Sequence, residues 1–273
     1  MQPQPRNPSS PTGVAVAHTD LAHRFAGNPI LRPSDVRPTV AGLEVACLLN
    51  PGAFRYRGRT GLLLRVAERP PQTESMVSTP VIDPAAPGGI RIVAVARTDP
   101  QLDSRDPRGF TWKSDTYLTT LSHLRLAWSD DGERFTAEDV PTLMGEGSLE
   151  GFGIEDCRVS TIGDRYLLTY TAVSAAGVGV GCIETRDWRS FRRIGMILPP
   201  HNKDCAIFEE RVGDHWMCLH RPSGIGLGGN YIWTARSPDL IHWGDHRCIA
   251  RTRPGMWDSE RIGAGAAPIR MPR

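Results

Sequence analysis

Residues 129–135 read SDDGERF, and this short element recurs twice along the chain. It recurs as TRDWRSF at residues 185–191 and as SPDLIHW at residues 237–243. In every copy an aspartate stands four residues before an aromatic residue, and the successive aspartates are 56 and 52 residues apart. An aspartate that accepts backbone hydrogen bonds, followed by an aromatic residue that begins the next strand, is typical of a tight turn. We therefore expect a hairpin at the edge of each repeated unit.

A second repeated element supports the same period. Gly163-Asp164 precedes RYLLTY, and Gly213-Asp214 precedes HWMCLH 50 residues later, each as a two-residue hairpin signal. Gly58 lies 105 residues before Gly163, which is about two periods. The strand-like runs are short and helical periodicity is almost absent, so the chain is predicted to be all-β. Repeats of this length predict a β-propeller with four full units and the start of a fifth, at residues 256–270.

Length and charge limit the organisation and the partners. The 273 residues suit one large domain, and we expect an N-terminal extension over 1–40 and a β-propeller catalytic domain over 41–273. Residues 69–87 are rich in proline and are expected to form a loop. The formal charge is +2, from 32 basic and 30 acidic residues, which gives no reason to expect nucleic acid as a partner.

The apolar runs and cysteines indicate a soluble, cytoplasmic protein. The apolar run at residues 13–17 is too short for a signal peptide, and no stretch approaches the roughly 18 apolar residues that a membrane span needs. No two cysteines have the spacing of a zinc knuckle, so no metal is implied. Buried, reduced thiols are favoured over disulfides for the six cysteines, which are Cys47, Cys157, Cys182, Cys205, Cys218 and Cys248.

Polar residues at the starts of inner strands would meet at the centre of a propeller. They fall in five stretches, which are 50–65, 155–158, 201–208, 219–222 and 258–265. Carboxylates together with Lys203, Arg221 and Arg261 suit a polyhydroxylated ligand plus an anion.

Each of these residues also has a purely structural interpretation. Asp156 could cap a turn or pair with Arg158, and Lys203 could form a solvated pair with Asp204. Arg221 could cover apolar surface with its stem, and His220 could be a core histidine.

At these residues the sequence resembles glycoside hydrolase family 130, the mannoside phosphorylases and related mannosidases. The similar segments are LLNPGAFRYRGRTGLLLRVAER (48–69), YLTTLSHLRLAWSDDGERFT (117–136), GIEDCRVSTIGDRYLLTYTA (153–172), PPHNKDCAIFEERVGDHWMCLHRP (199–222), IWTARSPDLIHWGDH (232–246) and MWDSERIGAGAAPIR (256–270). The resemblance implies a five-bladed β-propeller, in agreement with the repeat count.

The resemblance also implies the role of individual residues. The general acid would be Asp156, with Cys157 where the family usually has proline, a change that loosens the local turn. Asn50 and Arg65 would bind the mannosyl residue. Arg158, Asp204 and Asp258 are further residues that we expect to bind the substrate. The residues implied to bind phosphate are Lys203, Arg221 and Arg261, and their retention favours phosphorolysis over hydrolysis.

The resemblance weakens at the C-terminus. Family members usually continue into a strand that ends in Tyr-His-Gly, whose histidine contacts phosphate, whereas this chain ends at Arg273 with MPR in that place. We therefore expect an incomplete last blade, either in a fragment or in a natural variant with a damaged site.

The expected reaction is inverting phosphorolysis of a β-mannoside, such as mannobiose or a manno-oligosaccharide, to give α-mannose 1-phosphate. Inorganic phosphate is the co-substrate, no other cofactor is implied, and the partners are a small carbohydrate and phosphate; a homo-oligomer stays open. One alternative is an inverting β-mannosidase with Glu155 or Asp258 as the base. Another is a catalytically inactive sugar-binding propeller. The insertion between Arg69 and Tyr117 is expected to shape the side of the site that receives the acceptor sugar.

Overall fold

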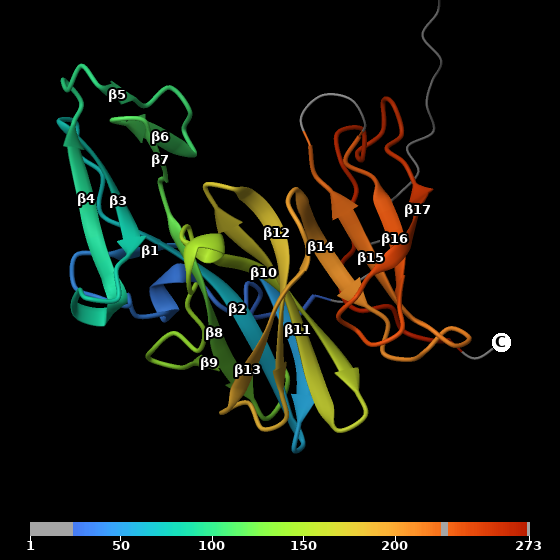
Figure 1. Ribbon diagram of the computed structural model, residues 1–273. Coiled ribbons are helices and arrows are strands. Elements are labelled where there is room, and N and C mark those ends of the chain that lie inside the picture. The colour runs from blue at the N-terminus through green and yellow to red at the C-terminus, as the bar shows by residue number, and fades with distance from the viewer. Residues whose placement is uncertain (1–23, 225–228, 272–273) are drawn as a thin grey trace, which may run out of the picture.

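The chain folds into antiparallel β-sheets, three of which have four strands each (Figure 1). The structure is a computed structural model that describes residues 24–224 and 229–271. Residues 1–23 of the expected N-terminal extension lie outside the described residues. The three large sheets follow one another in chain order, and strands of each sheet contact strands of the next.

The first large sheet has the order β1-β2-β8-β9 and the other two follow the chain without crossovers. Its strands are β1 (Glu44–Tyr56), β2 (Arg59–Arg69), β8 (Leu121–Ser129) and β9 (Thr136–Ala137). The second sheet contains β10 (Ile154–Ile162), β11 (Arg165–Ser174), β12 (Gly177–Thr185) and β13 (Phe191–Leu198). The third contains β14 (Asn202–Ile207), β15 (Trp216–Pro222), β16 (Ile232–Ser237) and β17 (Gly244–Ala250).

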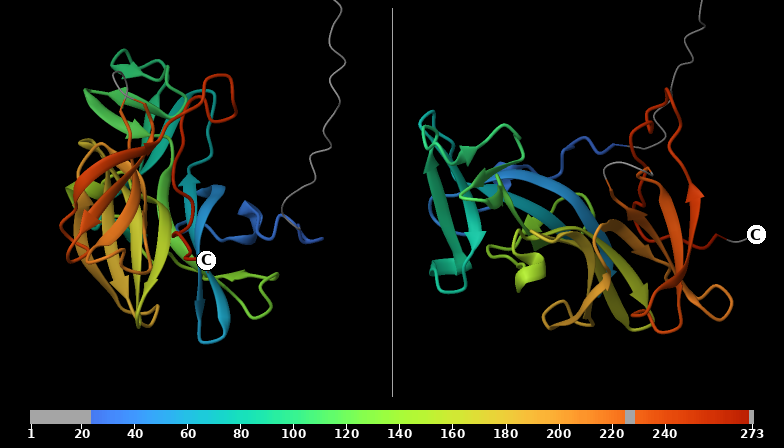
Figure 2. Two further views of the ribbon diagram at one scale, coloured as in Figure 1. Left: turned by 90° about the vertical axis from the view of Figure 1, so that its right-hand side faces the viewer. Right: turned by 45° about the horizontal axis from the view of Figure 1, so that its top comes forward.

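An insertion between β2 and β8 builds two small sheets that project from one end of the molecule (Figures 1 and 2). Its strands are β3 (Met76–Ile82), β4 (Ile90–Ala96), β5 (Leu102–Asp103), β6 (Gly109–Trp112) and β7 (Asp115–Leu118). The helical elements of the described chain are the 3-10 turns η1 (Pro33–Asp35), η2 (Pro87–Gly89) and η3 (Ser148–Glu150). None of the described helices is long and apolar enough to cross a membrane. The prediction of a loop over residues 69–87 is wrong in part, because this stretch contains β3.

The insertion also explains why the repeat count of four full units was too high. Leu124 pairs with Arg65, so the segment that carries the first SDDGERF element completes the sheet that β1 begins. The 105 residues between Gly58 and Gly163 are thus one unit lengthened by an insertion, rather than two units. Beyond β17, the described residues 251–271 contain no strand, and Arg261 forms one isolated bridge with Asn230.

The predicted edge turns are confirmed. They join the third and fourth strands of each large sheet, and their aspartates accept hydrogen bonds from backbone N–H groups two and three residues later. The residue after each aspartate has a positive φ, 82° at Gly132, 57° at Trp188 and 73° at Leu240. A preceding hydroxyl, from Ser129, Thr185 or Ser237, accepts the N–H of that residue.

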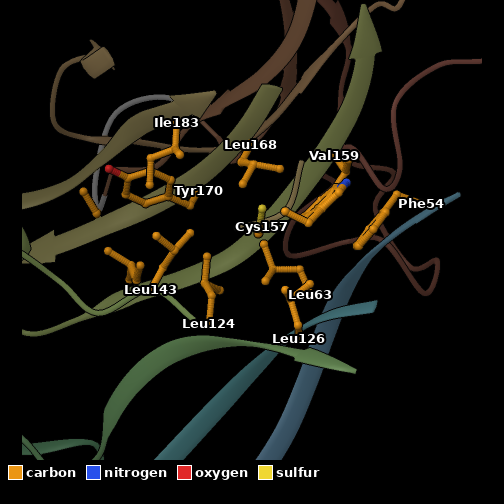
Figure 3. Close-up of a cluster of buried hydrophobic side chains, with 13 residues drawn as sticks. Phe54, Leu63, Leu124, Leu126, Leu143, Cys157, Val159, Leu168, Tyr170 and Ile183 are labelled. Carbon is orange, nitrogen blue, oxygen red and sulfur yellow. The ribbon is translucent and has the colours of Figure 1, made fainter. Parts of the chain in front are cut away.

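The core lies between neighbouring sheets. Leu63, Leu124 and Leu126 of the first sheet pack against Leu168 and the ring of Tyr170 in the second (Figure 3). A further cluster joins the second sheet to the third. All six cysteines are free thiols; Cys157, Cys182, Cys205 and Cys218 are buried as expected, whereas Cys47 is exposed and Cys248 half-buried.

Candidate active site

A distorted first strand in each large sheet supplies the central polar side chains. Asn50 in β1, Asp156 in β10 and Asp204 in β14 have positive φ angles of 35°, 50° and 54°. The strand pairing slips at each of these residues, as it does at a β-bulge. Bulges re-aim a side chain, and Asn and Asp tolerate a positive φ better than most other residues. Three equivalent distortions therefore present three short polar side chains to one place.

Arg65 of β2 forms hydrogen bonds to the side chains in the first part of the site, which contains Asp156 and Glu155. Its Nη1 donates to Asp156 Oδ1 at 3.0 Å and its Nη2 donates to Glu155 Oε1 at 2.7 Å. Its Nε donates to the Ser122 hydroxyl at 3.0 Å. Asn50 Nδ2 donates to the same Asp156 oxygen at 3.0 Å. Asp156 Oδ2 has no hydrogen-bond partner among the described residues, so this oxygen is available to a ligand.

Asp204 forms ion pairs with the two arginines of the second part of the site, Arg158 and Arg221. Its Oδ2 accepts Arg221 Nη1 at 2.6 Å, and its Oδ1 lies 3.4 Å from Arg158 Nη2. Arg221 is only 7% exposed, and its Nε is buried without a partner within the described chain. A buried guanidinium with an unused N–H is suited to an anion, because such groups bind anion oxygens strongly.

A cavity of about 530 Å³ joins these two parts. It is lined by all the predicted site residues except Asp258, namely Asn50, Arg65, Asp156, Arg158, Lys203, Asp204, Arg221 and Arg261. Asp258 is instead paired with Arg253, whose Nε lies 2.9 Å from Asp258 Oδ2. The structure thus brings together the predicted acid and the three predicted phosphate-binding cations.

The charges of this site do not cancel. Arg65 pairs with both Glu155 and Asp156, and Arg158 and Arg221 both pair with Asp204. In the described ranges, neither Lys203 nor Arg261 forms an ion pair. Five cations therefore stand against three carboxylates, and the site carries about two positive charges when all groups are ionised.

The pKa values of the two neighbouring carboxyls shift in opposite directions. Burial raises the pKa of Glu155, and this outweighs the opposing effect of Arg65 and Lys203. Burial also acts to raise the pKa of Asp156, but Arg65 and Asn50 outweigh it, so the pKa of Asp156 lies below its usual range. Asp156 is thus ionised at neutral pH in the ligand-free site.

A second, larger cavity of about 1050 Å³ adjoins the first. Arg65 and Lys203 line both cavities, and Glu155 lines only the second. The insertion supplies its opposite wall, through β6, β7 and residues such as Arg108 and Tyr117. No sequence signal singled out these wall residues, because their role depends on how the insertion folds back.

Of the purely structural interpretations of single residues, the structure supports the one for His220 and not the side-chain pairs Asp156–Arg158 and Lys203–Asp204. Arg158 donates to the backbone oxygen of Asp156 at 2.5 Å rather than to its carboxylate. Asp204 pairs with two arginines instead of Lys203, so a solvated Lys203–Asp204 pair does not form. His220 is a satisfied core histidine, 2% exposed and hydrogen-bonded to Asn202 at 3.1 Å.

Comparison with known proteins agrees with the fold and identifies the family. Residues 106–272 match the glycoside hydrolase 130 family, described as β-1,4-mannooligosaccharide phosphorylase. A β-1,2-mannobiose phosphorylase of Listeria innocua is 38% identical over 252 residues, covering 91% of this chain and 71% of the relative. A 1,2-β-oligomannan phosphorylase of Thermoanaerobacter is 33% identical over 167 residues, covering 56% of this chain and 51% of the relative.

Solved structures show the same relationship. The Listeria innocua β-1,2-mannobiose phosphorylase in complex with β-1,2-mannobiose superimposes with a TM-score of 0.84 at 39% identity, over 91% of this chain and 71% of that one. A putative glycosidase of Bacteroides thetaiotaomicron, at 19% identity and a TM-score of 0.62 over 89% of this chain and 67% of that one, shares the fold. Together these matches define the class of protein, an enzyme that processes glycosides. The chain belongs to glycoside hydrolase family 130, the family of β-mannoside phosphorylases and related mannosidases.

Proposed function

We propose that the protein catalyses the inverting phosphorolysis of β-mannosides to α-mannose 1-phosphate, with β-1,2-mannobiose as the first substrate to test. The 38% identity to a β-1,2-mannobiose phosphorylase supports this linkage. We further propose that the three large sheets are blades of a β-propeller around the central cavity, out of five that the family resemblance implies. Residues 41–273 would then be one catalytic domain.

One observation carries this proposal: Lys203 and Arg261 face the cavity without a carboxylate partner in the described chain, next to Asp156. Phosphate at neutral pH carries between one and two negative charges, which complements the two uncompensated cations. Phosphate is already a competent nucleophile, so it needs alignment and charge stabilisation rather than a base. One carboxylic acid and a group of cations are sufficient for the reaction.

The proposed bond changes follow from this arrangement. A phosphate oxygen forms a bond to the anomeric carbon as the bond to the leaving sugar oxygen breaks. The proton that the leaving oxygen needs comes from Asp156, through a hydroxyl of the mannosyl residue as the family resemblance implies. Bound phosphate adds negative charge and neutralises nearby cations, which raises the pKa of Asp156 and favours its protonated form in the reactive complex.

The larger cavity is proposed to hold the leaving sugar. It opens directly beside the smaller one at Arg65 and Lys203, and Glu155 contributes a carboxylate that can accept sugar hydroxyls. The wall formed by the insertion supports the expected role of this segment on the acceptor side.

The positions of the alternative bases argue against the hydrolase. Glu155 and Asp156 bind the two terminal nitrogens of a single guanidinium, which does not suit an acid and a base on opposite faces of a sugar ring. Asp258 is held by Arg253 and does not line the cavity.

The test is synthesis in the reverse direction. We expect the protein to release inorganic phosphate from α-mannose 1-phosphate when mannose is supplied as acceptor, with a β-1,2-linked disaccharide as the product. An Asp156→Asn variant should bind both substrates and form product at least about a hundredfold more slowly. Release of phosphate at the same rate without an acceptor would mean simple hydrolysis, and binding without any turnover would select the inactive sugar-binding protein.

A further inference from the structure

The side chain of Arg158 is almost completely used by the protein itself. It is 12% exposed, and it donates to the backbone oxygens of Asp156 at 2.5 Å, Ala264 at 3.0 Å and Gly265 at 3.3 Å. It also contacts Asp204 Oδ1 at 3.4 Å. A guanidinium has five N–H donors, so these four contacts leave one for any ligand.

Two of the three carbonyls that Arg158 binds, those of Ala264 and Gly265, belong to a segment with few other backbone hydrogen bonds. Residues 261–266 contain no strand, and Ile262 N donates to Asn230 O at 3.0 Å, a backbone bond that ties the segment to the third sheet's neighbourhood. The same segment carries Arg261, one of the two cations without a partner among the described residues. The position of the Arg261 charge therefore depends on how this segment is seated.

Gly263 shows how tightly the segment sits. A Cβ atom at this position would lie 2.5 Å from Asp204 Oδ2 and 2.7 Å from Arg221 Nη1. A real Cβ atom does not make contacts this short, so the backbone of Gly263 lies directly against the Asp204–Arg221 ion pair. Arg158 touches the same Asp204, so the arginine, the ion pair and the segment form one continuous contact.

We propose that Arg158 is a positioning residue that seats segment 261–266, and with it Arg261, against the phosphate-binding cavity. This role takes the place of the substrate-binding role that we expect for Arg158 from the sequence. Because Arg158 is also bonded to the backbone of Asp156, it ties the strand of the proposed acid to the segment of the proposed phosphate ligand. Only the kinetic part of the test below rests on the proposed function.

The first experiment is hydrogen–deuterium exchange of intact Arg158→Lys and Arg158→Gln variants. A lysine amine cannot reach acceptors on three segments, so amide exchange in peptides that cover 259–266 should become about tenfold faster or more, while β11 and β12 keep their protection. Equal exchange in this segment for the wild type and both variants would overturn the proposal.

A matched pair of glycine variants tests the same contact by changing segment 261–266 in place of Arg158. Gly263→Ala must lift the segment and should accelerate exchange in the same peptides. Gly265→Ala, whose Cβ would have no atom within 4 Å, should leave that exchange unchanged. Identical exchange in the two variants would contradict the proposed seat, and this pair decides the question if both Arg158 variants fail to fold.

The second experiment is a double-mutant cycle on the KM for phosphate. Arg158→Lys and Arg261→Gln should each raise this KM by about tenfold, and the double variant should be little worse than either single one. The KM for β-1,2-mannobiose should change far less, a split that a general loss of structure would not produce. Multiplicative effects, or a selective rise in the KM for mannobiose, would show that Arg158 acts separately from Arg261. If the wild type shows no phosphorolysis, the proposed function fails while the exchange experiments still decide the role of Arg158.

Discussion

At the residue scale, the site depends on Asp156 and the charges around it. The sequence predicted this residue through its place before a buried strand and through the family resemblance. It did not predict the bulge at Asp156, where φ is 50°, because a bulge is a slip in the pairing with another strand, here β11, and leaves no local signal in the sequence. Asp258 is the predicted residue that does not line the cavity, and it pairs with Arg253 in a segment without regular structure.

The first prediction concerns the proton donor. Asp156→Asn keeps the shape of the side chain and removes the transferable proton, so kcat should fall by about 10²- to 10⁴-fold. The KM values for phosphate and mannobiose should change little. Initial-rate kinetics measure this, and a kcat within a factor of a few of the wild type would refute the assigned acid.

The second prediction concerns pH. The pKa of Asp156 is lowered in the ligand-free site, and bound phosphate is expected to raise it. Because the protonated form is the active one, kcat at saturating phosphate should fall as the pH rises through the pKa of the complex. That pKa should lie above the value obtained by NMR titration of the ligand-free protein. Equal values in the two measurements would remove the proposed role of phosphate in protonating Asp156.

At the element scale, the repeated turn was the most reliable signal in the sequence. The Asp131, Asp187 and Asp239 turns depend on local hydrogen bonds, so a sequence pattern of seven residues is sufficient to predict them. The pairing of β2 with β8 was not predictable in this way, because two strands separated by a long insertion carry no local signal. The miscount of repeated units has this one cause.

The third prediction concerns these turns. Hydrogen bonds from the backbone N–H groups of Ser190 and Arg189 hold the pKa of Asp187 below its usual range. A lowered pKa in the folded state gives stability that is present at neutral pH and is lost as the pH falls through that pKa. Asp187→Ala should therefore lower the thermal midpoint at pH 7, with the difference from wild type shrinking towards pH 2. A pH-independent difference would point to packing instead.

The fourth prediction concerns the insertion. Tyr117 lines the larger cavity and stacks on Phe110, with ring centroids 5.0 Å apart. Tyr117→Ala should raise the KM for mannose as acceptor in the synthetic direction, with little change in the KM for α-mannose 1-phosphate. Trp112→Ala, in the same small sheet but outside the cavity wall, is the control and should leave the acceptor KM unchanged. The same effect in both variants would mean that the small sheet was merely destabilised.

At the scale of the whole molecule, the net charge gives no indication of a local cationic site. A formal net charge of +2 over 273 residues gives no reason to expect an anion site, yet the smaller cavity is lined by five of the basic residues and only two carboxylates, Asp156 and Asp204. Composition cannot predict such a concentration, because it arises only when the first strands of separate sheets and the segment 261–266 meet. The family resemblance supplied the residues, and the structure supplied their arrangement.

The fifth prediction uses the stability of the whole protein. A ligand that binds only the folded state raises the unfolding temperature with its concentration. Phosphate should therefore raise the thermal midpoint of the wild type, and a Lys203→Met, Arg261→Gln double variant should lose most of this response. Sodium chloride at equal ionic strength is the control, and an equal rise with chloride would indicate general salt stabilisation.

The most direct test of phosphorolysis at this site follows β-1,2-mannobiose and inorganic phosphate by ³¹P NMR in the presence of the protein. The account predicts that the phosphate signal declines as α-mannose 1-phosphate appears, in equal amount to the mannose released. Release of mannose at an unchanged rate without phosphate, or a β-configured mannose 1-phosphate, would contradict it.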